Sequence, residues 1–374
     1  MSPSDPRIVF AQGRSSHADP ADALREGLSE LLGALAREGA TPGDIAGLTL
    51  TAPEPQGFHL SRREIDGAWR EVCGGLRRPL RYARGGTELT LRAEAHVRQP
   101  IPALPVWRGM SVPEIARAYS PRQQADMQGV FRRWNHDGAL ARAGQTGLDL
   151  AYGPSRDESL DFVAARDPRA PVWVFLHGGY WQACTKDQHG QFAEGMLRHG
   201  FAFANLDYGL APETPLTEIV LQVRRALTFL VGQADALGFD PARLHLAGHS
   251  AGAQLAGMAA LDEKGPPVRS ALLLSGVFDL APIAHLPMGP MIGLEGDAMI
   301  RSLSPMSYPA PSARIGVALG GLETDEFKRQ SREMAEAWGA PAPLVVAGRH
   351  HFDLLEDLRA ESELLDLALR TAAD

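Results

Sequence analysis

The pentapeptide Gly248-His249-Ser250-Ala251-Gly252 has the form G-x-S-x-G. Its first two residues end the apolar run RLHLAGH at residues 243–249, and AQLAGMAAL follows at 253–261, so the motif joins an expected strand to an expected helix. In that context the glycines permit a sharp turn that lifts the serine hydroxyl above the sheet, at a helix N-terminus where negative charge is favoured. We therefore predict that Ser250 is a nucleophile, in preference to a small-residue turn that serves packing alone.

A serine nucleophile needs a general base, and the base needs a carboxylate to orient it. In this setting the chain order is serine, acid, histidine. His350 and His351 follow the last expected strand, APLVVAG at 342–348, whereas His285 comes too early. The acid is expected after the strand RIGVALG at 314–320, where three residues are candidates: Glu323, Asp325 and Glu326. Chain order alone leaves both choices open.

Residues 175–182, FLHGGYWQ, end an apolar run with two glycines and two large aromatic residues. Adjacent glycines let backbone N–H groups approach a ligand closely. An HGG sequence after a strand and ahead of the nucleophile is typical of an oxyanion loop. We expect N–H groups of this loop and of Ala251 to hold the oxyanion of a tetrahedral intermediate. Tyr180 and Trp181 are expected either to face the substrate or to pack beneath the loop.

The elements that must position these residues alternate along the chain. Amphipathic stretches, such as LTEIVLQVRRALTFLVGQADALG at 216–238, separate short apolar runs. The runs are PVWVFLH (171–177), FAFANLDY (201–208), RLHLAGH (243–249), SALLLSG (270–276), RIGVALG (314–320) and APLVVAG (342–348). This alternation predicts, for residues 106–374, an α/β fold with a mostly parallel sheet covered by helices on both faces. Residues 1–98 are expected to form a small α+β domain, and the proline-rich segment QPIPALP at 99–105 a stiff linker.

Composition excludes several classes of protein. The net charge of −8 argues against nucleic acid as a partner. No apolar segment approaches the ~20 residues of a membrane helix, and the N-terminus lacks the pattern of a signal peptide. Only two cysteines occur, Cys73 and Cys184, and no Cys/His cluster has zinc spacing. We therefore expect a cytoplasmic protein without a metal or an organic cofactor.

Residues from about 105 to 374 resemble the kynurenine formamidase (arylformamidase) branch of the α/β-hydrolases. The motifs that carry this resemblance are HGGYWQ (177–182), LDYGLAP (206–212), AGHSAGAQLA (247–256), LSGVFDLAPI (274–283), EFKRQSRE (326–333) and HFDLLEDL (351–358). The resemblance implies an α/β-hydrolase fold. It also implies a serine hydrolase that cleaves the formamide or a related amide bond of an N-formyl arylamine, such as N-formylkynurenine, through a formyl-enzyme on Ser250. Two other functions stay open: a broad-range carboxylesterase, and a catalytically dead hydrolase-fold protein that binds partners.

The same resemblance implies roles for single residues. The family's histidine precedes a phenylalanine, which matches His351. Its acid falls on Glu323, where the family usually has aspartate, so Asp325 stays an alternative. The implied oxyanion hole comprises Gly178, Gly179, Tyr180 and Ala251. Tyr180 and Trp181 are the implied contacts to the substrate.

Residues 7–98 resemble the Rid-type enamine/imine deaminases, whose fold is close to that of monofunctional bacterial chorismate mutases. The resemblance depends on element order and on GATPGDIAGLTL (39–50) and RRPLRYA (77–83). It places the Rid arginine on Arg81 and the Rid catalytic glutamate on Arg92 or Glu94, with Arg92 in the best register. Because guanidinium groups bind carboxylates but do not exchange protons near neutral pH, we expect a carboxylate-binding site rather than a deaminase. The resemblance also implies a homo-oligomer, such as a trimer, formed through this domain.

Overall fold

The computed structural model divides the chain into two compact units, Met1–Ala103 and Leu104–Asp374. Each unit is considered by itself. The residues that the structure describes are 7–15, 19–37, 45–52, 68, 80–84, 89–97, 105–121 and 126–373. Residues 99–104 of the expected linker lie outside them. No helix among the described residues is long and apolar enough to cross a membrane.

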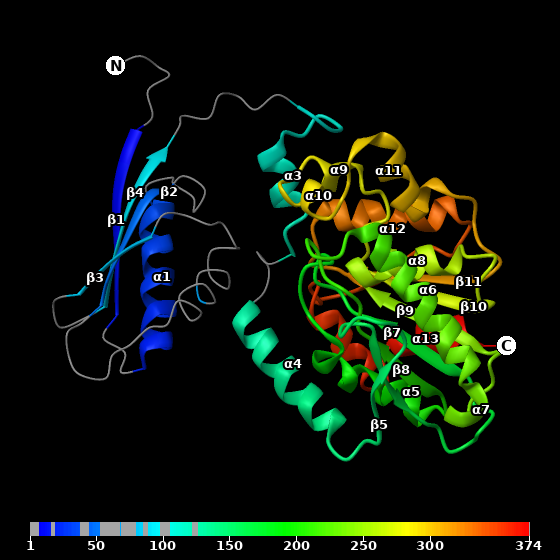
Figure 1. The fold of residues 1–374 in the computed structure, drawn as a ribbon. Coiled ribbons are helices and arrows are strands. Elements are labelled where there is room, and N and C mark those ends of the chain that lie inside the picture. Colours follow the sequence, from blue (N-terminus) through cyan, green and yellow to red (C-terminus); the bar gives the residue numbers. More distant parts are fainter. Residues whose placement is uncertain are drawn as a thin grey trace. The chain divides into compact units, whose positions relative to one another are not determined.

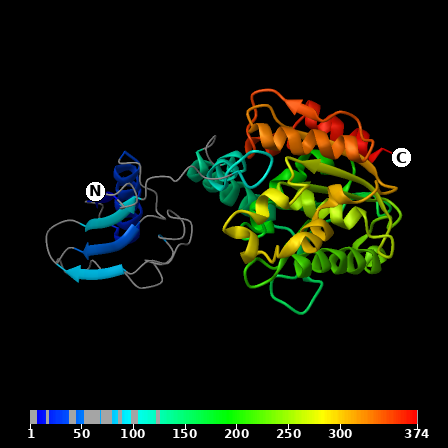
Figure 2. The ribbon, with the colours of Figure 1, turned by 90° about the horizontal axis from the view of Figure 1, so that it is seen from above.

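Among the described residues of the first unit, helix α1 packs against a four-stranded sheet of order β1-β4-β2-β3, and Figure 2 shows this helix on one side of the strands. Its elements are β1 (Arg7–Ser15), α1 (Pro20–Arg37), β2 (Ile45–Ala52), β3 (Leu80–Arg84) and β4 (Leu89–Val97). Strand β4 runs antiparallel to β1 and β2, whereas β2 and β3 are parallel. Asp19 caps α1 by accepting hydrogen bonds from the N–H groups of Ala21 and Asp22, at 2.9 and 3.0 Å. Leucines spaced four, three and four residues apart form the buried face of α1: Leu24, Leu28, Leu31 and Leu35.

The second unit is built on an eight-stranded sheet of order β12-β11-β10-β9-β7-β8-β6-β5, visible in Figure 1. The strands are β5 (Gly147–Ala151), β6 (Ser159–Val163), β7 (Val172–Leu176), β8 (Ala202–Leu206), β9 (Leu244–His249), β10 (Val268–Leu274), β11 (Arg314–Gly320) and β12 (Leu344–Val346). The six strands from β12 to β8 are parallel, and β6 and β5 add antiparallel pairs at one edge. The six apolar runs of the sequence correspond to these six parallel strands, whereas β5 and β6 were not predicted.

Helices cover both faces of this sheet. Strand β7 shows why, since Val172, Val174 and Leu176 join one buried cluster and Trp173 and Phe175 join the other. The α-helices are α3 (Val112–Ala118), α4 (Met127–Arg142), α5 (Glu194–Arg198), α6 (Leu216–Gly232), α7 (Ala234–Leu237), α8 (Ala251–Ala260), α9 (Ala281–Ala284), α10 (Met288–Met291), α11 (Gly296–Leu303), α12 (Asp325–Ala337) and α13 (Glu363–Ala372). Short 3-10 turns are Lys186–Gln188, Gly190–Ala193, Pro305–Ser307 and Asp353–Leu358. The predicted fold of the second unit, a mostly parallel sheet between helices, is confirmed.

The parallel strands bring distant loops to one edge of the sheet. Strands β7, β9, β11 and β12 end in the loops that carry the HGG sequence, Ser250, Glu323 and His351, respectively. Because the carboxyl ends of parallel strands lie at the same edge, these four loops converge. The order of the strands therefore assembles a site from residues that are up to 174 positions apart, from His177 to His351.

Candidate active site

Ser250 occupies a sharp turn between β9 and α8. Its φ of 56° and ψ of −118° form a conformation that costs a non-glycine residue about 1–3 kcal/mol. The turn closes because Gly248 and Gly252 lack side chains: a Cβ would lie 2.0 Å from the Gly252 oxygen in the first case and 2.1 Å from the Leu176 oxygen in the second. The Ser250 N–H donates to the carbonyl of Leu274 in β10, at 2.8 Å. Packing of the elbow against β7 and β10 therefore holds the serine in its strained conformation.

His351 and Glu323 form a buried hydrogen-bonded pair. The distance from His351 Nδ1 to Glu323 Oε2 is 2.8 Å, and each side chain is 1% exposed. Glu323 Oε1 accepts two further hydrogen bonds, from the Gly320 N–H at 2.7 Å and from Ser275 Oγ at 2.6 Å. Since the carboxylate accepts from Nδ1, that nitrogen carries the hydrogen of a neutral ring, and Nε2 keeps its lone pair.

The other candidates for the acid and the base have different surroundings. Asp325 is exposed at the first residue of α12. Glu326 accepts a hydrogen bond from the hydroxyl of Tyr119, at 2.8 Å. His350 contacts the backbone of its own loop, and His285 is exposed. Geometry therefore distinguishes candidates that chain order left open, and it favours the pair described above.

The HGG loop lies directly against the serine elbow. A Cβ on Gly178 would be 3.0 Å from Ser250 Cβ, and Gly179 has a φ of +111°, which side chains rarely permit. His177 Nδ1 donates to the Gly178 carbonyl at 2.7 Å, and the hydroxyl of Tyr208 donates to the His177 carbonyl at 2.6 Å. These bonds leave the loop's amide groups available: among the described residues, the N–H groups of Gly178 and Gly179 have no hydrogen-bond partner, and the same holds for Ala251.

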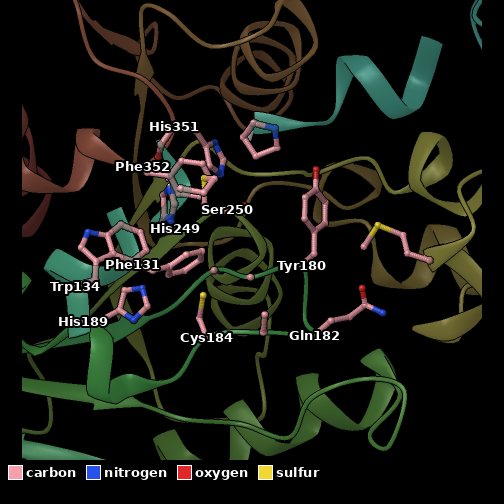
Figure 3. A pocket seen from close by; sticks show the side chains of 16 residues that line it. Phe131, Trp134, Tyr180, Gln182, Cys184, His189, His249, Ser250, His351 and Phe352 are labelled. Atoms are coloured by element: carbon pink, nitrogen blue, oxygen red, sulfur yellow. Dashed lines mark hydrogen bonds between the residues drawn. The ribbon is translucent and has the colours of Figure 1, made fainter. Parts of the chain in front are cut away.

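A pocket of about 200 Å³ opens at this point. Figure 3 shows Ser250 beside His351, with Phe131, Trp134 and His189 at one side of the pocket and Tyr180 and Gln182 at the other. The residues that line it are Pro121, Met127, Phe131, Trp134, Gly178, Gly179, Tyr180, Gln182, Ala183, Cys184, His189, His249, Ser250, Met288, His351 and Phe352. The structure thus brings the predicted serine, histidine and glycines to one wall, and it adds an aromatic wall.

The two aromatic residues after HGG have different environments. Tyr180 lines the pocket, and its hydroxyl donates to the carbonyl of Tyr119 at the end of α3. Trp181, in contrast, is fully buried in the core, where its Nε1 donates to Gln254 Oε1 at 3.0 Å. The prediction that Trp181 contacts the substrate is therefore wrong, because its ring fills the space beneath the loop instead.

Three histidines near the site are held in the neutral form. Burial, together with the nearby His177, lowers the pKa of His189 to about 3. Burial and the neighbouring His351 lower the pKa of His249 well below its ordinary value. Burial also lowers the pKa of His350. None of the three is expected to carry charge at neutral pH.

Known proteins share this architecture. The family BD-FAE matches residues 160–271. A kynurenine formamidase of Danio rerio is 31% identical over 287 residues, which cover 69% of this chain and 95% of that protein. The chain belongs to the kynurenine formamidase family. A family member from Salmo salar is 27% identical over 279 residues, covering 67% of this chain and 93% of the relative.

Two solved structures have a fold similar to that of this chain. Esterase LipW from Mycobacterium marinum is 25% identical with a TM-score of 0.53, and the match covers 66% of this chain and 86% of LipW. A protein of Silicibacter sp. tm1040, to which a thioesterase function has been ascribed, is 28% identical with a TM-score of 0.62. The match covers 67% of this chain and 97% of that protein. The protein is therefore an α/β-hydrolase that acts on amide or ester bonds. No group of side chains suited to holding a metal occurs among the residues described.

Several residues of the site were not found from the sequence. Met127, Phe131 and Trp134 reach the pocket from α4, more than a hundred residues before the serine. Their spacing of four and three residues marks one helical face, but it does not reveal what that face contacts. Ser275, which donates a hydrogen bond to Glu323, lies after β10 with a φ of 50°. It belongs to the motif LSGVFDLAPI, but that motif did not indicate a contact with the acid.

For the predicted site of the first unit, the main information is the pairing of its strands. Both Arg81 of β3 and Arg92 of β4 pair with Thr49 of β2. With neighbouring strands about 4.8 Å apart, the backbones of the two arginines lie ~10 Å from each other across β2. Arg92 is exposed, whereas the side chains of Arg81 and Glu94 lie outside the described residues. The strand pairing therefore places the backbones of Arg81 and Arg92 opposite the same residue of β2, one on each side of that strand.

Proposed function

We propose that this protein hydrolyses the formamide bond of an N-formyl arylamine through a formyl-enzyme on Ser250. The observation that carries the proposal is the buried Glu323–His351 pair, which shares a pocket with Ser250 and the HGG loop. The names of the relatives add support, since two of them are kynurenine formamidases. N-Formylkynurenine is therefore the first substrate to test.

In the proposed first step, Ser250 Oγ attacks the formyl carbon while His351 Nε2 accepts the hydroxyl proton. Glu323 stabilises the imidazolium that forms, because its carboxylate already accepts the Nδ1 hydrogen bond. The N–H groups of the HGG loop and of Ala251 stabilise the oxyanion. One such donor contributes about 10²–10³ in rate in a well-studied hydrolase.

In the second step, the proton on His351 passes to the departing arylamine nitrogen as the C–N bond breaks. Water then enters, His351 takes one of its protons, and the hydroxide attacks the formyl ester. Collapse of this intermediate releases formate and returns the proton to Ser250 Oγ. Every proton in this cycle moves through one nitrogen, Nε2 of His351.

The shape of the pocket supports an aromatic leaving group. Phe131, Trp134 and Phe352 form an apolar wall next to His351, and aromatic rings pack well on such a surface. A volume of about 200 Å³ is below the ~300–1,000 Å³ of sites for drug-sized ligands, which favours a one-ring substrate with a small acyl group.

Carboxylester hydrolysis is the second candidate, because the fold neighbours include an esterase and the apolar wall also suits an aryl ester. The test is kcat/KM for N-formylkynurenine, formanilides and aryl acetates, with labelling by a serine-reactive phosphonate. We expect the formamides to rank first. Higher kcat/KM for acetates than for every formamide would favour the esterase, and a protein that neither turns over nor reacts with phosphonate would be a dead hydrolase.

A further inference from the structure

His249, the residue immediately before Ser250, lies between the two loops that must act together. Its side chain is almost completely buried and lines the pocket. Its ring packs on the ring of His351, with centroids 4.7 Å apart. On its other side is the HGG loop, where a Cβ on Gly178 would be 3.2 Å from His249 Nδ1. Neither the motif nor the proposed chemistry assigns this imidazole a task.

The hydrogen bonding of His249 defines its protonation. Nε2 lies 2.8 Å from the carbonyl oxygen of His351. A carbonyl only accepts, so Nε2 carries the hydrogen and donates it. Burial favours the same neutral ring by lowering its pKa. His249 is therefore a fixed donor and, at neutral pH, neither gains nor loses a proton.

Two hydrogen bonds hold His351, one to its side chain and one to its backbone, and its ring also packs on the rings of Phe327 and Phe352. Glu323 fixes the ring through Nδ1, and His249 fixes the main chain through the carbonyl oxygen. The second attachment matters because the strand before this loop is short: β12 has three residues at the edge of the sheet, and among the described strands it pairs only with β11. Without the bond from His249, the backbone of this loop could shift and carry Nε2 away from Ser250, even with the ring contacts in place.

We propose that His249 is a positioning residue, which holds the His351 loop so that Nε2 stays in line with Ser250 Oγ. This role depends on the proposed serine chemistry, but not on the identity of the acyl group or the leaving group. Misplacement by about 1 Å can cost ~10²-fold in rate. Loss of the donor should therefore slow every reaction that His351 assists, by about 10- to 100-fold, with little change in KM.

The test compares variants by their rate of phosphonylation with an aryl phosphonate and by kcat and KM for the best substrate. A glutamine side chain would place an amide nitrogen near the position of the imidazole Nε2, so His249→Gln should stay within about threefold of wild type. His249→Asn is too short to reach the carbonyl and should lose about 10- to 100-fold. His249→Phe keeps an aromatic ring without the donor and should resemble the Asn variant.

A matched control is available on the same strand. His245 is also a buried histidine of β9, with its Nδ1 2.9 Å from Ser270 Oγ, and it does not line the pocket. His245→Gln should leave the phosphonylation rate unchanged, so any general cost of replacing a buried histidine in this strand is measured separately.

The results separate this proposal from the function proposed above. A wild-type protein that reacts with phosphonate but cleaves no formamide would contradict the formamidase proposal and leave the comparison of variants intact. Equal rates for folded His249→Asn and His249→Gln would overturn the positioning role. So would a wild-type protein inert to phosphonate, since no activated serine would then exist to be aligned.

Discussion

The candidate functional residues of the two units differ in how far they are exposed to solvent. In the second unit, Ser250, Glu323 and His351 are each at most 3% exposed, and each is fixed by neighbours from other elements. In the first unit, Arg92 is exposed on a sheet strand, level with Arg81 across β2. A buried constellation can pre-organise charge for a transition state, whereas an exposed guanidinium group is suited to binding an anion. The difference suggests that single substitutions act strongly in the second unit and weakly in the first.

The largest effect is expected at the nucleophile. Ser250→Ala should abolish hydrolysis and phosphonate labelling while leaving the fold intact, because alanine keeps the backbone of the elbow and removes only the hydroxyl. Losses of triad members typically reach several orders of magnitude in kcat. The measurement is kcat/KM beside circular dichroism. Retention of more than a tenth of wild-type activity would show that the buried site is not the catalytic one.

The next effect is expected at the acid. Glu323→Gln should lower kcat by about 10³–10⁴-fold, since an amide can donate to Nδ1 and so favour the wrong tautomer of His351. Asp325→Asn is the matched control, and it should stay close to wild type because that carboxylate is exposed. If the two variants exchanged these outcomes, the acid would be Asp325. On the same reasoning, His351→Ala should be far slower than His350→Ala.

These residues also show how much of the active site could be predicted from the sequence. Ser250 was found because its motif is local and needs only a strand before it and a helix after it. The order of residues along the chain could not decide whether Glu323 or Asp325 is the acid. That choice depends on which carboxylate the turn after β11 directs inward. Trp181 was misplaced for a related reason: a large aromatic residue after two glycines can turn toward the pocket or the core, and only the packing against Gln254 decides.

The fold was predictable to the extent that its strands are apolar. VWVFL of β7 is buried on both faces and was expected, whereas β5 and β6 carry aspartates and were not. Asp149 and Asp161 are paired with the buried Lys186, at 2.5 and 3.4 Å. A partner distant in sequence thus makes an acidic strand compatible with the sheet edge, and no periodicity reveals it.

A smaller effect concerns stability. Burial lowers the pKa of His189 from 6.5 to about 3. Between these two pH values, His189 is mostly protonated in the unfolded chain and mostly neutral in the folded chain. The stabilisation from this group is therefore complete above pH 6.5 and is lost as the pH falls toward 3, by about 2 kcal/mol at pH 5. Urea unfolding at pH 7.5 and pH 5 measures this loss. His189→Phe should reduce the pH dependence by that amount, and an unchanged dependence would contradict the assignment.

A further difference between the units should appear in assembly. We propose that the intact chain forms a homo-oligomer, such as a trimer, through the first unit, whose β4 has a buried apolar face and exposes Arg92 on the other. Light scattering should give a multiple of the chain mass for the intact protein and a smaller assembly for residues 105–374. A monomeric intact chain would contradict the proposal, and an equally large assembly of the shorter chain would move the interface to the hydrolase unit.

The smallest effect is expected at the two arginines. Register places Arg81 and Arg92 level across β2, and two guanidinium groups can bind a carboxylate but cannot donate and regain a proton near neutral pH. We therefore propose that the first unit binds small carboxylates. Calorimetric titration with simple 2-oxo acids should show binding that weakens about 10-fold in Arg81→Ala and in Arg92→Ala, with formamide hydrolysis unchanged. The opposing result is imine hydrolysis: if the wild-type protein clearly accelerates hydrolysis of an amino-acid-derived iminium and Arg81→Ala does not, the unit is an active deaminase. Glu94, two residues beyond Arg92 on β4, would then be the first residue to replace in the search for its acid.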